Sequence, residues 1–133
     1  MAENTFELKI IAPDEMFFEG TADFLEFTST NGEMGVYAQH LPTTVILEPG
    51  VVSIHQNGKV ERVAVMGGFV QILKDEITLM AEDAQWPNEI DVDRAKEAAQ
   101  RAKKRLASKD ASVDVKRAEA ALKRAMARIS AVR

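Results

Sequence analysis

Hydrophobic and polar residues alternate in short runs over the first 86 residues of the chain. Phe6, Leu8 and Ile10 point to one side of an extended segment, whereas Glu7 and Lys9 between them point to the other. Further apolar runs follow at short intervals, namely ADFLEFTST, TTVILE, VVSIHQ, KVERVAV, GGFVQIL and EITLMAE. Short runs separated by turn signals are typical of a β-sandwich or a β-barrel.

Glycine, proline and asparagine mark the predicted turns between these runs. Asn57-Gly58 is a strong β-hairpin signal because both residues tolerate positive φ. Pro49-Gly50 predicts a turn after TTVILE. Residues 60–65 and 77–79 are nearly apolar on both faces, which predicts that both faces of these strands are buried. Another subunit could bury the second face.

The period of the pattern becomes helical after Trp86-Pro87. Asn88 is the expected N-cap of a helix over residues 89–106, with Asp91 at the third helical position in the manner of a capping box. The sequence therefore predicts a β domain over residues 1–86 and a helical domain over residues 87–133.

A polar connector, residues 107–112, separates the first helix from a second one that extends to the end of the chain. Ser112 is the expected cap of this second helix. Because the connector is short, the two helices are expected to be antiparallel neighbours.

Small apolar residues form the predicted buried face of each helix. They recur at spacings of 3, 4 and 4 and comprise Ala95, Ala98, Ala102 and Leu106, then Ala118, Ala121, Ala125 and Ile129. A buried methyl contributes only about 1 kcal/mol or less, and isolated helices of this length are marginal in water. Two interpretations follow: a movable element that needs a partner or ligand, or a hairpin that stays docked on the β domain.

Charge divides along the same boundary. Residues 1–87 carry four Lys or Arg against 14 Asp or Glu, a net charge of −10, whereas residues 88–133 carry 13 against seven, a net charge of +6. Two oppositely charged halves indicate two different tasks, although charged helix faces are often only solvated.

The residues for catalysis are sparse. The chain has no cysteine, and its two histidines, His40 and His55, have no acidic neighbour at a spacing typical of catalysis or metal binding. The segment MGGF is too short for a phosphate-binding loop and is expected between strands. We therefore expect neither a free-standing enzyme nor a metal site.

No apolar run is long enough to cross a membrane or to serve as a secretion signal.

The strongest candidate site is a repeat within the helical domain, IDVDRAKEAAQRAKKRL at residues 90–106 and VDVKRAEAALKRAMARI at residues 113–129. Spacings of 7 and 4 place three arginines on one stripe of each helix: Arg94, Arg101 and Arg105, then Arg117, Arg124 and Arg128. The planar guanidinium suits phosphate because it donates two hydrogen bonds at once.

Asp91 admits two interpretations. In the first, Asp91 contributes to a ligand site: it orients Arg94, or it accepts a hydrogen bond from a sugar or an adenine amino group. In the second, it forms only a surface salt bridge with Arg94. A nucleic-acid-binding module is a further alternative for the basic domain, but its helices lack aromatic residues for base stacking.

Three motifs, in this order, resemble those of the bacterial ε subunits of F-type ATP synthases. They are NGEMGVYAQHLPTTVILEPGVV, VMGGFVQILKDEITLMAEDA and IDVDRA, and the resemblance covers essentially the whole chain. It implies a β + α fold: a flattened β-sandwich of about ten strands followed by an antiparallel two-helix hairpin.

The resemblance also implies a role. Such a subunit is a non-catalytic part of the central rotor stalk at the cytoplasmic face of the cell membrane, and it helps to couple proton translocation to rotation. Its β domain binds the γ subunit and the c-ring, and its hairpin extends towards the catalytic α and β subunits to inhibit ATP hydrolysis. In some members ATP stabilises the folded hairpin. No cofactor is required and no nucleic acid is bound.

Residues carry over from the family's motifs. The ATP-binding positions implied are Ile90, Asp91, Arg94, Ala95, Arg101, Arg124 and Arg128, and the positions implied on the c-ring side are Glu33 and His40. An alternative is the same subunit without useful ATP affinity.

Two departures from the family pattern bear on these expectations. The family usually has Pro-Gly where this chain has Ala38-Gln39, which affects the geometry of that turn. ATP-binding relatives can carry an acidic residue where this chain has Gln85, and the loss of that carboxylate is expected to weaken ATP binding or alter its dependence on magnesium.

Overall fold

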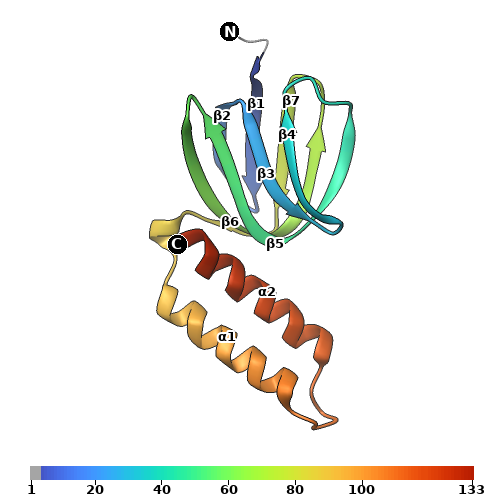
Figure 1. Cartoon of the computed structure of the whole chain (residues 1–133), viewed down its shortest axis with the longest axis vertical. Helices are drawn as coiled ribbons and strands as arrows, with labels where there is room; N and C mark the ends of the chain where they lie inside the picture. Colours follow the sequence, from blue (N-terminus) through green and yellow to red (C-terminus); the bar gives the residue numbers. More distant parts are fainter. Residues whose placement is uncertain (1–3) are drawn as a thin grey trace.

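The computed structural model describes residues 4–133, which form a β domain followed by a helical hairpin (Figure 1). The strands are β1 (Phe6–Ala12), β2 (Glu15–Ala22), β3 (Phe24–Ser29), β4 (Gly32–Tyr37), β5 (Thr43–Gln56), β6 (Lys59–Ile72), β7 (Glu76–Ala81) and β8 (Ala84–Gln85). A 3₁₀ helix, η2 (Pro87–Glu89), then leads into α1 (Val92–Ala107) and α2 (Val115–Val132). This order confirms the predicted fold class.

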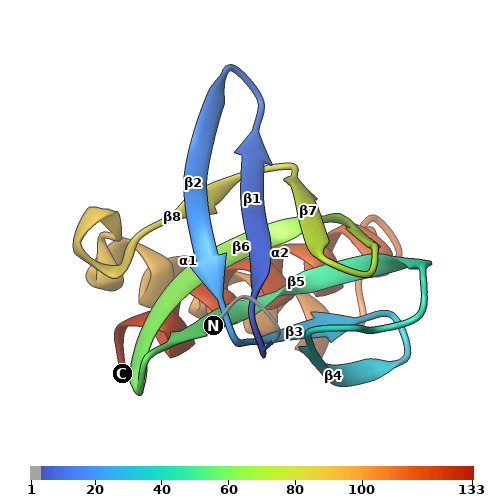
Figure 2. The same ribbon diagram turned by 90° about the horizontal axis from the view of Figure 1, so that it is seen from above.

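The strands lie in the order β2-β1-β7-β6-β5-β3-β4, and β8 pairs with β6. Within residues 4–133, β1 and β7 form the only parallel pair, and the other pairs are antiparallel. The β1–β2 hairpin lies at one end of this order and the β3–β4 hairpin at the other (Figure 2). Because β5 and β6 are 14 residues long and change neighbours along their length, the sheet folds over on itself into a sandwich.

Two predicted strand boundaries do not exist, so the count of about ten strands is too high for a chain that forms eight in its described part. Pro49-Gly50 lies inside β5, where it pairs with Met66 and Val65 of β6. Gly67-Gly68 likewise lies inside β6 and adopts positive φ, at 106° and 133°. At this point β6 exchanges β8 for β7 as its neighbour, so the glycines accommodate a change of partner within one strand.

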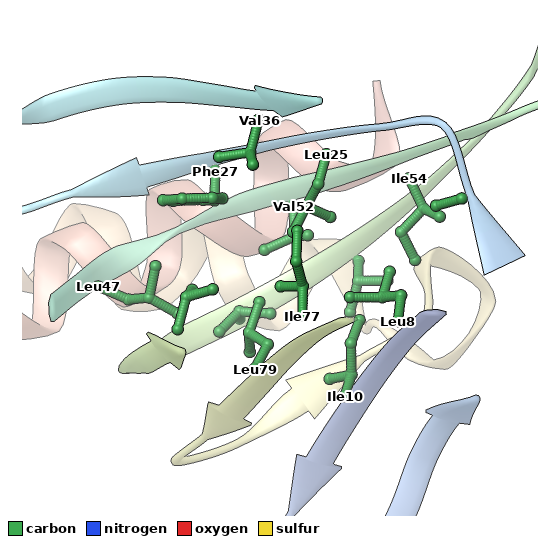
Figure 3. Close-up of a cluster of buried hydrophobic side chains, with 14 of the residues drawn as sticks. Leu8, Ile10, Leu25, Phe27, Val36, Leu47, Val52, Ile54, Ile77 and Leu79 are labelled. Atoms are coloured by element: carbon green, nitrogen blue, oxygen red, sulfur yellow. The ribbon is translucent and has the colours of Figure 1, made fainter. Parts of the chain in front are cut away.

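The main core lies between the layers of the sandwich (Figure 3). The alternation predicted for the first strand is confirmed, since Phe6, Leu8 and Ile10 are buried. Other members of this core are Leu25, Phe27, Val36, Leu47, Val52, Ile54, Val63, Val65, Val70, Ile72, Ile77 and Leu79. The β domain therefore has an apolar core that does not depend on the helices.

A second, smaller cluster joins the helices to the sandwich. Ala64 and Met66 of β6 pack against Ala127 and Ala131 of α2. The predicted burial of residues 60–65 on both faces holds only for their C-terminal half, where the chain's own α2, and not another subunit, covers Ala64. Val60, Glu61 and Arg62 are exposed. In β7, Ile77 and Leu79 face the core and Thr78 is half-buried on the outer side.

Aromatic stacking fixes the junction between the domains. The Trp86 ring stacks on Phe17 at a centroid distance of 4.8 Å and meets Phe18 edge-on at 6.3 Å. The Trp86 backbone N–H donates to Glu89 Oε1 at 2.9 Å. The chain therefore leaves the sandwich from a fixed point before the first helix begins.

Candidate functional site

The repeat in the helical domain places an aspartate cap at the start of each helix. Asp91 Oδ1 accepts a hydrogen bond from the Arg94 backbone N–H at 3.1 Å, and Asp114 Oδ1 accepts one from the Arg117 backbone N–H at 3.1 Å. The predicted caps Asn88 and Ser112 are therefore wrong. Pro87–Glu89 forms its own 3₁₀ turn, and the Ser112 backbone N–H donates instead to Asp110 Oδ1 at 2.9 Å, which lowers the pKa of the Asp110 carboxyl.

The two helices pair through alanine, as predicted, but α2 has two buried faces. Ala95, Ala99 and Ala102 of α1 are buried. Four residues of the predicted seam are only half-buried: Ala98, Leu106, Ala121 and Ile129. On α2, Ala118 and Ala125 continue the predicted seam, and Ala127 and Ala131 lie on the side that meets the sheet. Figure 1 shows α2 between the sandwich and α1.

Both arginine stripes lie on the same face of the hairpin. An α-helix turns about 100° per residue, so each stripe lies somewhat more than a quarter of a turn from its alanine seam. The offset has the same rotational sense on both helices, and because the helices are antiparallel both stripes emerge on one side. Arg94, Arg101 and Arg124 are exposed there, and none of their side chains makes an ion pair or hydrogen bond within residues 4–133.

The structure contradicts one of the predicted roles of Asp91, the surface salt bridge with the Arg94 side chain. Its carboxylate caps the backbone of α1, and no ion pair with the Arg94 side chain occurs in the described part of the chain. An exposed carboxylate that accepts one hydrogen bond keeps further acceptor sites. The cap therefore leaves Asp91 able to accept from a ligand.

The two apolar members of the implied ATP site have packing roles. Ile90 packs against the cluster that joins α2 to β6, and Ala95 is buried in the seam between the helices. Both residues therefore lie where the hairpin is held together, next to the start of the arginine face.

Arg128 is the one arginine of the implied site that is tied to the β domain. Its Nε donates to Gln85 Oε1 at 2.6 Å, and its Nη2 lies 3.5 Å from Asp83 Oδ2. Gln85, where the family resemblance implies an acidic residue in ATP-binding members, is thus the direct partner of an implied ATP ligand. Sequence spacing could not reveal this contact because 43 residues separate Gln85 from Arg128.

Polar contacts on the opposite flank of α2 complete the docking. Lys123 Nζ lies 3.5 Å from Glu48 Oε2. Arg62 Nη1 donates to the carbonyl oxygens of Ser130 at 3.5 Å and of Arg133 at 3.3 Å, at the end of α2 where its carbonyls lack helical partners. Docking therefore rests on a small apolar cluster with polar contacts on both sides.

Glu33 and His40 lie near opposite ends of β4. Glu33 is its second residue and borders a groove of about 490 Å³ with Arg62 and Ser130, whereas His40 follows the strand. The turn before His40 places Gln39 at a φ of 66°, a left-handed conformation that suits the glycine of the family pattern. The Gln39 side-chain amide donates to Asp75 Oδ1 at 3.0 Å, which holds this turn against the β6–β7 connection.

An exposed apolar row crosses the outer face of the sandwich, away from the helices. Cross-strand neighbours form it in the order Met16, Ile11, Met80, Phe69 and Ile46, from β2 through β1, β7 and β6 to β5. Met16 at one end of the row is 49% exposed, and Phe69 and Ile46 at the other end are 41% and 55% exposed. Ile11 and Met80 between them are half-buried. A contiguous exposed apolar row of this kind typically marks a protein-binding surface.

Within residues 4–133, no group of His, Asp or Glu side chains could hold a metal ion. The helices in this part of the chain are all too short or too polar to cross a membrane.

The fold and these surfaces define a binding and assembly protein with two parts. Two family profiles match the chain: the ATP synthase delta/epsilon chain beta-sandwich domain over residues 5–87, and the ATP synthase delta/epsilon chain long alpha-helix domain over residues 88–133. The chain therefore belongs to the ATP synthase delta/epsilon family. Members of this family are non-catalytic subunits of ATP synthase.

Curated relatives agree with this assignment. The chain is 42% identical over 127 residues to an ATP synthase epsilon chain of Ruminiclostridium cellulolyticum, covering 96% of this chain and 95% of the relative. It is 40% identical over 129 residues to the ATP synthase epsilon chain of Desulfitobacterium hafniense strain Y51, covering 97% of each.

Solved structures share the fold. A chain in the mitochondrial ATP synthase of Euglena gracilis matches with a TM-score of 0.85 at 24% identity, over 98% of this chain and 82% of that one. A chain in the central stalk and c-ring structure of the Tetrahymena thermophila enzyme matches with a TM-score of 0.70 at 12% identity, over 96% of each.

Proposed function

We propose that this protein is the ε subunit in the central stalk of an F-type ATP synthase, where it helps to couple proton translocation to rotation. Its β domain binds the γ subunit and the c-ring, and the complex holds it at the cytoplasmic face of the membrane. The hairpin is a regulatory arm. When undocked, it extends towards the catalytic α and β subunits and inhibits ATP hydrolysis.

The small docking interface of α2 is the observation that carries the proposal for the arm. The apolar part of this contact consists mainly of Ala127 and Ala131 against Ala64 and Met66, and the polar contacts lie at its exposed flanks. Burial of a few methyl groups contributes only about 1 kcal/mol each. The sandwich retains its own core when the hairpin leaves, so docking and undocking leave the β domain folded.

The apolar row supports the division of labour between the domains. Met16, Phe69 and Ile46 lie on a face that the hairpin does not cover. We assign this face to the γ subunit, and Glu33 and His40 to the side of the c-ring. The positive arm then remains free to meet acidic surfaces of the catalytic subunits.

ATP is the proposed effector of the docked arm. The shared arginine face offers Arg94, Arg101 and Arg124 to phosphates, and Asp91 offers an acceptor beside Ile90 and Ala95. Arg128 contributes its remaining N–H groups. A ligand that binds only the docked state stabilises that state by mass action.

Removal of the arm tests the proposal. In the reconstituted complex, a chain that lacks residues 88–133 should still assemble with γ and should relieve the inhibition of ATP hydrolysis. Loss of assembly would contradict the assignment of partner binding to the β domain.

The contact between Arg128 and Gln85 favours one alternative, a hairpin that docks without useful ATP affinity. Calorimetric titration distinguishes the two, because absence of heat at millimolar ATP would leave the arm regulated by protein contacts alone.

A further inference from the structure

Arg128 and Gln85 join the two domains through one short side-chain hydrogen bond. The donor Nε lies 2.6 Å from Gln85 Oε1, and the Arg128 side chain is only 29% exposed. A hydrogen bond from a charged donor is stronger than one between neutral groups, and partial burial limits competition from water. This contact therefore adds to a docking interface that consists of a small apolar cluster and polar contacts at its flanks, among them the ion pair between Arg128 Nη2 and Asp83 Oδ2 at 3.5 Å.

The position of Gln85 is fixed by the sheet. Gln85 lies in β8 opposite Ala64 of β6, and Ala64 itself packs against Ala127 and Ala131 of α2. The acceptor thus lies beside the apolar contact on the same strand pair. It meets Arg128, which lies between those two alanines in sequence, only when α2 lies on the sheet.

The other arginines of the same face provide the contrast. Arg105 is the equivalent of Arg128 in the first copy of the repeat, and it is exposed. Arg124, one turn before Arg128, has no ion pair or side-chain hydrogen bond within the described residues. The interdomain contact is therefore particular to Arg128 and is not a general property of the stripe.

We infer that Gln85 is a positioning residue that holds Arg128 and thereby stabilises the docked hairpin in the absence of any nucleotide. The nature of residue 85 then sets the balance between docked and undocked arms. A neutral amide oxygen gives a contact of intermediate strength, an apolar residue would weaken the docking of α2, and a carboxylate would hold α2 more firmly through a charge-assisted pair with Arg128.

Hydrogen exchange of the full-length chain without nucleotide tests the inference. Mass spectrometry of peptides from α2 (Val115–Val132) reports undocking, and peptides from β6 report the integrity of the sandwich. Gln85→Ala should accelerate exchange in α2 by about fivefold, and Arg128→Gln, which also loses the ion pair with Asp83, by at least as much. The double variant should exchange no faster than Arg128→Gln alone. Gln85→Glu should slow exchange.

Arg105→Gln is the matched control and should leave exchange in α2 unchanged. The inference is overturned if Gln85→Ala and Arg128→Gln exchange like the unmodified protein, if their effects add, or if Arg105→Gln has as large an effect. Should Gln85→Ala also disturb β6, the opposite shift expected of Gln85→Glu decides the question. Because no nucleotide is present, the outcome is independent of whether the arm binds ATP.

Discussion

Asp91 and Asp114 occupy equivalent positions in the two copies of the repeat, and each carboxylate accepts the backbone N–H of the arginine three residues later at 3.1 Å. The aspartates thus explain why the repeat begins where it does: each copy encodes a helix start. The last arginines of the two copies differ in their contacts: Arg128 is hydrogen-bonded to the β domain, whereas its equivalent Arg105 is exposed.

Removal of either cap should destabilise its own helix. Asp91→Ala and Asp114→Ala each remove the acceptor for an otherwise unpaired N–H, at a cost of about 1 kcal/mol. Hydrogen exchange should show faster opening of the first turn of α1 in one variant and of α2 in the other. Ser112→Ala is the control, and a comparable effect of that substitution would contradict the assignment of Asp114 as the cap.

The bend of β6 should not tolerate a side chain at Gly68. A Cβ there would lie 1.9 Å from the Met80 carbonyl oxygen, and φ is 133°. We expect Gly68→Ala to lower the free energy of unfolding by about 3 kcal/mol or more, measured by urea denaturation.

Gly58→Ala is the control for the effect of positive φ alone, because φ there is 79° and no atom lies within 4 Å of the added Cβ. It should cost about 1 kcal/mol. Equal costs at the two positions would show that the close approach to Met80 does not limit this strand.

Charge on the arginine face should govern any binding of ATP to the isolated protein. Arg124→Gln should weaken binding by about tenfold, as expected for loss of one hydrogen bond from a charged donor. Isothermal titration calorimetry measures the affinity. Lys116→Gln, which changes charge equally but lies outside the stripe, should retain the affinity of the unmodified chain. Equal losses in both variants would indicate a general effect of charge.

The apolar row should be required for assembly and not for folding. Phe69→Glu places a charge at a residue that is 41% exposed, so the isolated protein should fold while its binding to γ is lost. Copurification of the reconstituted stalk measures assembly, and thermal melting of the isolated chain checks the fold. Gln71→Glu changes the next outward position of β6 and should assemble normally. Assembly of Phe69→Glu at the level of this control would exclude the row from the interface.

Local sequence signals predicted much of the fold. The Asn57-Gly58 hairpin is confirmed, with φ of 52° and 79° at the two residues, because a two-residue turn depends on its own backbone preferences. Pro49-Gly50 failed as a turn signal for the opposite reason. The neighbouring strand β6 pairs with β5 on both sides of it, and this tertiary pairing overrides the local preference.

The candidate site divides in the same way. The helical period of the sequence was sufficient to predict the two arginine stripes and the alanine seam. It could not predict that Ala127 and Ala131 form a second buried face, because that depends on which side of α2 meets the sheet.

The sequence by itself determined the two-domain order, the helical hairpin, the clustering of positive charge and the family resemblance, since these depend on composition, on period and on residues close together in the chain. The tertiary structure alone decided that β5 and β6 run unbroken through both layers, that α2 covers Ala64 and Met66, and that Arg128 meets Gln85. Each of these contacts joins segments far apart in the chain, so its energy comes from partners that no local pattern specifies.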